Sequence, residues 1–295
     1  MTTPTNLTQP RRKTRQVFVR NIPIGGDAPI PVQTMVKVPT SDYDRVMREI
    51  ESTAVVDPEK LDEREQNILK EINAWEDAYA LRPFHCDITR VSVPNDESAA
   101  TFPAIVKNSP IPVVADIHFR SDMALAALEA GTDKLRINPG NISNPALLKK
   151  IAQEAVAKGI PIRVGVNAGS LAKDLLEQYG DHSAEALAIS AERSVRLLEE
   201  QDVRNILVSM KANDARWTID AYRNFAQKND YPLHVGVTEA GAGRAAVVNS
   251  WTGVGTLLQM GIGDTIRISL TEDPRLEVVI GHLLLHYLGL PRVKY

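Results

Sequence analysis

An apolar run in this sequence ends in two polar residues that are two positions apart, which is the pattern expected at the end of a strand. Arg136 and Asn138 lie in the segment 133–141, which runs into a Pro-Gly turn. Because successive strand residues face opposite sides, Arg136 and Asn138 share one face while Leu135 and Ile137 share the other. A cation and an amide that face the same way at the carboxyl end of a strand favour the binding of an anion.

The same arrangement recurs at the ends of other apolar runs. Their polar residues are evenly spaced and project to one side: Arg90 with Ser92, Asp116 with His118, Arg163 with Asn167, Lys211 with Asn213, and Arg267 with Ser269. So many cations in one place would repel one another unless an anion neutralised them. A diphosphate suits their number, and planar guanidinium groups suit its oxygens. Taken singly, an arginine is more often structural, so it is the matching positions that indicate a binding site.

Length and composition limit the class of protein. The chain has 295 residues, 43% hydrophobic and 24% charged, which is ordinary for a globular protein of one large domain or two small ones. A net charge of −3 weighs against a nucleic-acid binder. The single cysteine, Cys86, excludes a disulfide framework and an all-cysteine iron–sulfur site built from this chain alone, and we predict no metal ligands in it. Without a membrane span or a secretory signal, we expect a cytoplasmic protein with no membrane contact.

The elements that must position the polar side chains alternate between strand and helix. Gly131, Gly159 and Gly261 each close a helical pattern just before the next strand. We expect eight strands, at 31–35, 87–93, 111–117, 134–137, 160–166, 205–210, 233–237 and 265–268. Eight strand–helix units predict an α/β fold, a (β/α)8 TIM barrel with its active site at the carboxyl ends of the strands. The alternative, a doubly wound open sheet, would carry a G-x-G-x-x-G loop after its first strand, and the sequence has none.

The barrel is expected to extend over residues 17–290, and a short strand is predicted at its start, at 17–19. Residues 1–16 are polar and basic, and we predict a flexible tail there, while 291–295 form the C-terminal end. Residues 51–83 make a long and charged connection between the first two strands. Apolar residues at near-helical spacing predict that it is an extended helical crossover or an inserted helical hairpin.

Several candidate residues allow two interpretations. Asp116 would also be explained by a salt bridge to an arginine in the barrel, and His118 by a satisfied interior position. Glu239 follows the seventh strand out of phase with the inward residues, so it faces the mouth only if the strand twists there. It is still the best carboxylate for proton transfer. Cys86 precedes the second strand and is expected to be a small core residue.

Several motifs together resemble the 4-hydroxy-3-methylbut-2-enyl diphosphate synthase family, the reductive iron–sulfur enzymes of the non-mevalonate isoprenoid pathway. The motifs span nearly the whole chain, at 11–13, 28–35, 90–94, 114–119, 135–142, 162–170, 238–241 and 261–270. The resemblance implies reductive ring opening and dehydroxylation of 2-C-methyl-D-erythritol 2,4-cyclodiphosphate. By motif match, the diphosphate would be held by Arg90, Arg136, Arg163, Lys211 and Arg267, with Asn138, Asn167 and Ser269. Asp116 and His118 match the family's polar pair, and Glu239 matches its mouth glutamate, a candidate proton donor or orienter.

Two features depart from the family pattern. The crossover at 51–83 is longer, which bears on a subunit contact more than on catalysis. The family also continues past the barrel into a domain whose three cysteines and a glutamate hold a 4Fe-4S cluster, whereas this sequence stops at Tyr295. The resemblance therefore implies a 4Fe-4S cluster that the reaction needs but that this chain alone cannot bind. It suggests a cluster-bearing protein chain as partner, within a homodimer or a hetero-oligomer.

Three functions remain open from the sequence. The chain is the substrate-binding barrel of the synthase, either as a split subunit or as a truncated product. Alternatively, it is a non-catalytic paralogue that binds the cyclodiphosphate, or a barrel enzyme with non-redox chemistry on a related diphosphate or pterin-like substrate. The first is favoured because the diphosphate-binding set and Glu239 are all present. The second would need neither Glu239 nor a partner, and the third predicts turnover by the lone chain without iron.

Overall fold

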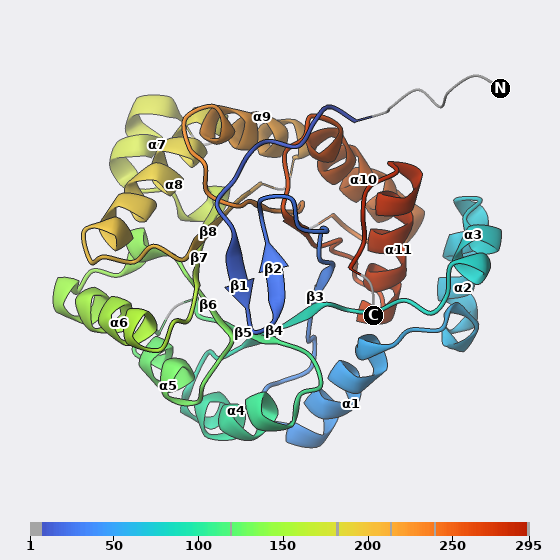
Figure 1. The fold of residues 1–295 in the computed structure, drawn as a ribbon, viewed down its shortest axis with the longest axis horizontal. Helices are drawn as coiled ribbons and strands as arrows, with labels where there is room; N and C mark the ends of the chain where they lie inside the picture. Colours follow the sequence, from blue (N-terminus) through green and yellow to red (C-terminus); the bar gives the residue numbers. More distant parts are fainter. Residues whose placement is uncertain (1–7, 119, 181–182, 213, 239, 294–295) are drawn as a thin grey trace.

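A closed ring of parallel strands surrounded by helices forms the centre of the molecule (Figure 1). The computed structural model describes residues 8–118, 120–180, 183–212, 214–238 and 240–293. One sheet has the order β3 (Gln33–Met35), β4 (Ile88–Ser92), β5 (Val113–Asp116), β6 (Lys134–Ile137), β7 (Ile162–Asn167) and β8 (Ile206–Lys211). A second pair, β9 (His234–Val235) and β10 (Thr265–Ile266), completes the ring through parallel bridges from Leu233 to Val208 and from Ile266 to Val32. The predicted TIM barrel is confirmed.

The helices that follow the strands begin where the sequence supplies capping side chains. Asn95, Asn144, Ser183, Asp214 and Asp273 each accept a hydrogen bond from a backbone N–H in the first turn of the next helix. The surrounding helices are α1 (Tyr43–Ala54), α4 (Asp96–Asn108), α5 (Met123–Glu129), α6 (Pro145–Ala157), α7 (Lys173–Tyr179), α8 (Ala184–Glu199), α9 (Ala215–Ala226), α10 (Gly243–Gln259) and α11 (Pro274–Tyr287). Among the described helices, none is long and apolar enough to cross a membrane.

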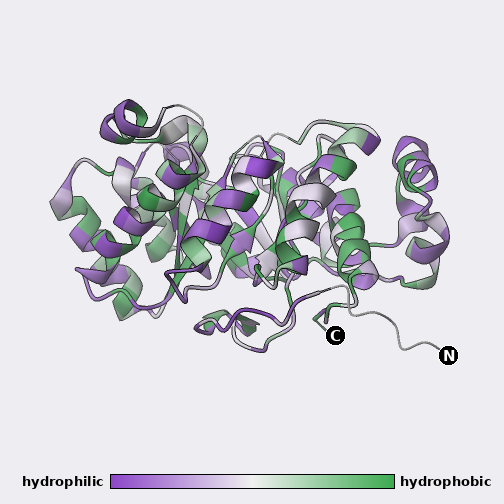
Figure 2. Ribbon diagram, turned by 90° about the horizontal axis from the view of Figure 1, so that it is seen from above, coloured by the Kyte–Doolittle hydropathy of each residue, from purple (hydrophilic) through white to green (hydrophobic). Residues whose placement is uncertain are grey.

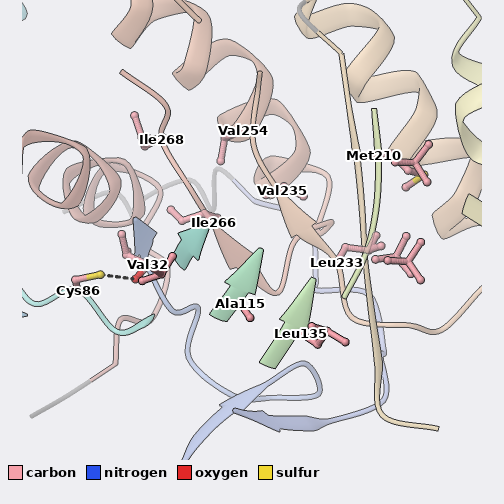
Figure 3. Packing of buried hydrophobic residues seen from close by; sticks show 14 of the residues in the cluster. Val32, Cys86, Ala115, Leu135, Met210, Leu233, Val235, Val254, Ile266 and Ile268 are labelled. Atoms are coloured by element: carbon pink, nitrogen blue, oxygen red, sulfur yellow. Dashed lines mark hydrogen bonds between the residues drawn. The ribbon is translucent and has the colours of Figure 1, made fainter. Parts of the chain in front are cut away.

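The main hydrophobic core lies between the ring of strands and the ring of helices (Figure 3). Outward strand residues such as Ala115, Leu135 and Val235 are fully buried there. Cys86 belongs to this core as predicted, and its Sγ lies 3.9 Å from the carbonyl oxygen of Val32. Burial raises the pKa of the Cys86 thiol, so the thiol stays protonated and acts as a small apolar side chain.

A β-hairpin closes the lower end of the barrel, where the strands begin. Antiparallel strands β1 (Val17–Val19) and β2 (Ile22–Ile24) lie across the barrel axis in Figure 1 and on one side of the helical ring in Figure 2. Their inner side chains form a second apolar cluster with residues from the first half of three barrel strands, Ile88, Val114 and Leu207. The first strand of this hairpin is predicted by the sequence, whereas the second is not.

The segment before the hairpin is more ordered than the flexible tail expected for residues 1–16. Backbone N–H groups of Gln9 and Arg12 donate to the carbonyl oxygens of Gln259 and Gly261. Arg11 forms a salt bridge of 3.0 Å with Asp264, whose side chain is almost fully buried. The described part of this segment, residues 8–16, is therefore fixed against the lower end of the barrel, while residues 1–7 lie outside the described residues.

The crossover between the first two barrel strands is helical, as expected. After α1, it contains a 3-10 turn (Pro58–Lys60) and the short helices α2 (Glu63–Glu71) and α3 (Trp75–Ala80). A capping box between Asp62 and Glu65 fixes the start of α2. Both helices lie outside the ring beside α11 and α10 (Figure 1).

Candidate functional site

A cavity of about 300 Å³ opens at the carboxyl ends of the strands. Eight of the ten predicted substrate-binding residues line it: Arg90, His118, Arg136, Arg163, Asn167, Lys211, Arg267 and Ser269. Ser209, Thr238, Ala240, Gly241, Leu270 and Thr271 complete its wall. The strand alternation on which the prediction rested therefore brings together side chains from residue 90 to residue 271 of the chain.

Asp116 joins three of the predicted residues beneath the cavity. Its carboxylate lies 3.3 Å from Arg136 Nη1, 3.5 Å from Arg90 Nε and 2.9 Å from His118 Nε2. Burial alone would raise the pKa of Asp116, but the charge of Arg90, the hydrogen bond from His118 and the charge of Arg136 hold it well below its usual range. Asp116 is therefore an ionised carboxylate that orients two arginines and a histidine, which is the salt-bridge interpretation of this residue.

A second carboxylate holds Arg267 from outside the barrel. Glu277 on α11 accepts from Arg267 Nη2 at 3.2 Å, from Thr34 Oγ1 at 2.7 Å and from Lys37 Nζ at 3.1 Å. It is fully buried, and burial would raise its pKa, but the charges of Arg267 and Lys37 and the hydrogen bond from Thr34 lower that pKa. An ionised Glu277 thus fixes the guanidinium of Arg267 at the cavity wall.

Gly165 on β7 and Gly236 just after β9 leave room for cationic side chains of the neighbouring strands β6 and β8. A Cβ added to Gly165 would lie 2.1 Å from Arg136 Nε, and one added to Gly236 would lie 2.7 Å from Lys211 Nζ. The carbonyl oxygen of Gly165 also accepts from Arg136 Nη2 at 3.0 Å. Asn167, two residues further along β7, accepts from the same Nη2 at 3.3 Å in the amide orientation that satisfies both ends of its side chain.

Below the cavity, the barrel interior remains polar and cationic. Lys134, two residues before Arg136 on β6, is fully buried and donates one hydrogen bond, of 3.3 Å, to Gln33 Oε1. Burial and the nearby charges of Arg163 and Arg90 lower the pKa of Lys134 well below its ordinary value. His234 is buried beside them, and among the described residues neither of its ring nitrogens has a hydrogen-bond partner. Burial and the charges of Arg163 and Lys211 lower its pKa, so His234 is neutral.

The charges around the cavity do not balance. Six basic side chains of the barrel interior are buried or nearly so, and of the described carboxylates Asp116 and Glu277 pair with them: Arg90, Lys134, Arg136, Arg163, Lys211 and Arg267. Arg163 Nε and Nη2 have no partner among the described residues. Such a site has a strong positive potential and unsatisfied donors, and both favour a multiply charged anion.

Not every predicted residue is placed at the cavity. Asn138 stands just after β6, and its Oδ1 accepts from Ser194 Oγ on α8 at 3.4 Å, so it does not line the cavity. Glu239, the predicted catalytic residue, and Asn213 lie outside the described residues. Their roles remain predictions from the sequence.

The structure adds residues that sequence reasoning missed, and some of them carried a signal. Ser209 and Lys134 precede Lys211 and Arg136 by two residues, so strand alternation alone places them on the inward face. Glu277 carried no such signal, because it comes from a helix and reaches the site only through folding. Gly165 and Gly236 would be recognised only once the paths of the neighbouring cations are known.

The described residues contain no group of three or more His, Cys, Asp or Glu side chains that could hold a metal ion. The only cysteine of the sequence is buried in the core as an inert thiol. A cluster held by several thiolates does not fit these residues. The arginines, the lysine and the amide that line the cavity can bind and orient an anion.

Comparison with known proteins places the sequence among characterised relatives. Residues 65–282 match the family described as GcpE TIM-barrel domain. The 4-hydroxy-3-methylbut-2-en-1-yl diphosphate synthase (flavodoxin) of Aquifex aeolicus is 43% identical over 282 residues, which are 96% of this chain and 71% of that protein. The enzyme of the same name from Symbiobacterium thermophilum is 44% identical over 280 residues, which are 95% of this chain and 68% of that protein.

Solved structures with little sequence identity share the fold. The dihydropteroate synthase of Yersinia pestis covers 94% of this chain and 100% of its own length with a TM-score of 0.53 and 10% identity. The dihydropteroate synthase of Xanthomonas albilineans gives a TM-score of 0.52 at 9% identity, over 94% of this chain and 98% of its own. At this identity, the likeness supports the barrel fold alone.

Proposed function

This chain belongs to the GcpE TIM-barrel family, and from that premise we propose that it is the substrate-binding barrel of 4-hydroxy-3-methylbut-2-enyl diphosphate synthase. Its substrate is 2-C-methyl-D-erythritol 2,4-cyclodiphosphate, whose ring is opened and dehydroxylated by two-electron reduction. The reaction needs a 4Fe-4S cluster to supply electrons. The residues of this chain bind and orient the substrate.

The observation that carries the proposal is the excess of buried cations at one cavity. Five arginine and lysine side chains line it, and the carboxylates of Asp116 and Glu277 offset only two of them. An unpaired buried charge costs several kcal/mol. A cyclic diphosphate offsets that cost when it binds, because its oxygens accept from donors such as Arg163 Nη2 that otherwise lack a partner among the described residues.

The geometry supports a division of roles among the residues. Arg90, Arg136, Arg163, Lys211 and Arg267 bind the diphosphate, with Asn167 and Ser269 as further polar contacts. Asp116 and Glu277 hold the guanidinium groups in place before the substrate arrives, which lowers the ordering cost of binding. Asn138 does not line the cavity and contributes indirectly, through its hydrogen bond with Ser194 on α8. Glu239 is the proposed proton donor or orienter, on the strength of its motif.

The 4Fe-4S cluster of the enzyme lies outside the barrel in this proposal. The cluster is held either by another chain, in a homodimer or a hetero-oligomer whose contacts cover the open end of the barrel, or by a further domain of a longer protein of which this sequence is a part. The lack of a possible metal-binding group among the described residues is compatible with this arrangement. Electrons then reach the substrate from outside the barrel.

Calorimetric titration of the purified, iron-free chain with the cyclodiphosphate tests the proposal. We expect saturable binding at micromolar concentrations that weakens as salt is added, because charged contacts dominate. Methylerythritol without phosphate groups is the matched ligand control and should not bind. Binding of both ligands alike, or of neither at millimolar concentration, would contradict the assignment. Turnover without an iron-bearing partner would favour non-redox chemistry instead.

A further inference from the structure

Lys134 is a buried amine to which the proposed function gives no task. It projects inward from β6, one inward position below Arg136, and none of its surface is exposed to solvent. Its hydrogen bond to Gln33 Oε1, at 3.3 Å, is the one that the described residues provide for the amine. Gln33 is neutral, so this contact does not offset a positive charge.

The charged groups that face Lys134 are cations. Arg90 on β4 and Arg163 on β7 act on it from two sides of the barrel, and neutral His234 faces it from β9. Among the described carboxylates, none contacts its Nζ, because Asp116 and Glu277 pair with the arginines. A protonated Lys134 in this position would be a buried charge that only repulsion surrounds.

Arg163 connects Lys134 to the cavity. Its guanidinium lines the cavity wall, it is 1% exposed, and it donates to Ser209 Oγ while Nε and Nη2 remain without partners among the described residues. An anion that fills those donors brings negative charge close to the layer that holds Lys134. The electrostatic surroundings of the amine therefore differ between the empty and the occupied barrel.

We propose that Lys134 adjusts the charge of the barrel floor, being uncharged when the cavity is empty and taking up a proton when a multiply charged anion binds above it. This inference rests on the proposed function, because it requires a diphosphate at Arg163. Lys134 is then a positioning residue that acts through Arg163. Its positive charge is present when the anion is bound, and the empty barrel does not have to bury that charge.

The lowered pKa of Lys134 in the empty barrel gives the sign of the expected pH dependence. Binding raises the pKa of the amine, so the complex holds more protons than the free protein between the two pKa values. Affinity is highest below the free pKa, falls by about tenfold per pH unit between the two values for one proton, and is constant again above the bound pKa. Lys211 and His234 also have lowered pKa values, so a variant must separate their contribution from that of Lys134.

Calorimetric titration with inorganic diphosphate in buffers of different ionisation enthalpy measures the proton uptake directly. We compare the unaltered chain with Lys134→Met, which keeps the length of the side chain without an amine, and with Lys149→Met on the exposed face of α6 as the matched control. Proton exchange by the ligand itself is common to all three proteins and cancels in the comparison. We expect Lys134→Met to bind diphosphate with less proton uptake and a flatter dependence of affinity on pH, and Lys149→Met to behave like the unaltered chain.

The outcomes separate this inference from the proposed function. If the unaltered chain does not bind diphosphate, both fail. If it binds and Lys134→Met takes up as many protons, the inference is overturned while the diphosphate site stands, and the uptake belongs to Lys211 or His234. Lys134→Gln repeats the test in case Lys134→Met does not fold, with the circular dichroism of each variant as the check.

Discussion

Arg136 on β6 occupies a space that Gly165 leaves on the neighbouring strand β7. The carbonyl oxygen of Gly165 accepts from Arg136 Nη2 at 3.0 Å, and a Cβ on Gly165 would lie 2.1 Å from Nε. Contact with both the backbone of β7 and the carboxylate of Asp116 fixes the guanidinium from two sides. The position of Arg136 thus depends on the absence of a side chain at Gly165.

Gly165→Ala should weaken diphosphate binding without removing any polar group. The added methyl group forces Arg136 away from its place, and the loss of its charge-assisted hydrogen bond to the ligand costs roughly 1.5–3 kcal/mol of binding free energy. Calorimetry of the variant measures the loss. Gly169→Ala is the control, because an added Cβ there meets nothing within 4 Å. Equal affinity of Gly165→Ala and the unaltered chain would show that this close approach is unimportant for binding.

Arg136→Ala should reduce the affinity for the cyclodiphosphate by roughly 1.5–3 kcal/mol, the usual contribution of a charge-assisted hydrogen bond. Calorimetric titration gives the value, and Arg216→Ala, with a side chain 87% exposed on α9, serves as the control. An unchanged affinity would remove Arg136 from the site. Loss of the folded state would instead point to the buried Asp116, which this substitution deprives of a partner.

Glu277→Gln should destabilise the fold by roughly 3–5 kcal/mol at neutral pH, because it leaves Arg267 and Lys37 without their buried carboxylate. The pKa of Glu277 is lower in the folded chain than its ordinary value of 4.5, so its contribution to stability is present above that value. The contribution is lost as the pH falls through the folded pKa.

Urea unfolding at neutral pH and in the acid range measures both effects. The stability difference between the unaltered chain and Glu277→Gln should shrink on acidification. Glu129→Gln, on the exposed end of α5, is the control and should change stability little at either pH. A difference that stays constant with pH would mean that Glu277 is not ionised in the fold.

Glu239→Gln should abolish turnover by the chain reconstituted with a cluster-bearing partner and leave binding nearly intact. The amide keeps the shape of the side chain but cannot donate or accept the proton. Turnover assays together with calorimetry separate the two effects. A loss of binding as large as the loss of turnover would assign Glu239 to substrate binding and not to catalysis.

Strand periodicity predicted most of the cavity wall because inward residues on parallel strands converge at one end of a barrel. Arg90, Arg163 and Lys211 needed only that rule. Asn138 did not follow this rule. Strand β6 ends at Ile137, so the side chains after it need not point alternately inward and outward, and Asn138 contacts α8 instead.

Polar segments were harder to interpret than apolar ones. The basic residues before the hairpin suggested a solvated tail, yet Arg11 pairs with the buried Asp264, and that partner lies 253 residues away in the sequence. Strand β2 was missed because the turn before it has Arg20 at a φ of 54° in place of the glycine that usually marks such a turn. Glu277 and Gly165 act through tertiary contacts, which periodicity does not contain.

The hairpin of β1 and β2 has a kinetic consequence. Its apolar side chains pack against Ile88, Val114 and Leu207 and close the lower end of the barrel. Among the described residues, the cavity therefore opens at the carboxyl ends of the strands. The substrate then enters and the product leaves through the same opening, so the product must leave before the next substrate can bind. A domain that covers this opening must move away once in every catalytic cycle, and the rate of that movement limits turnover.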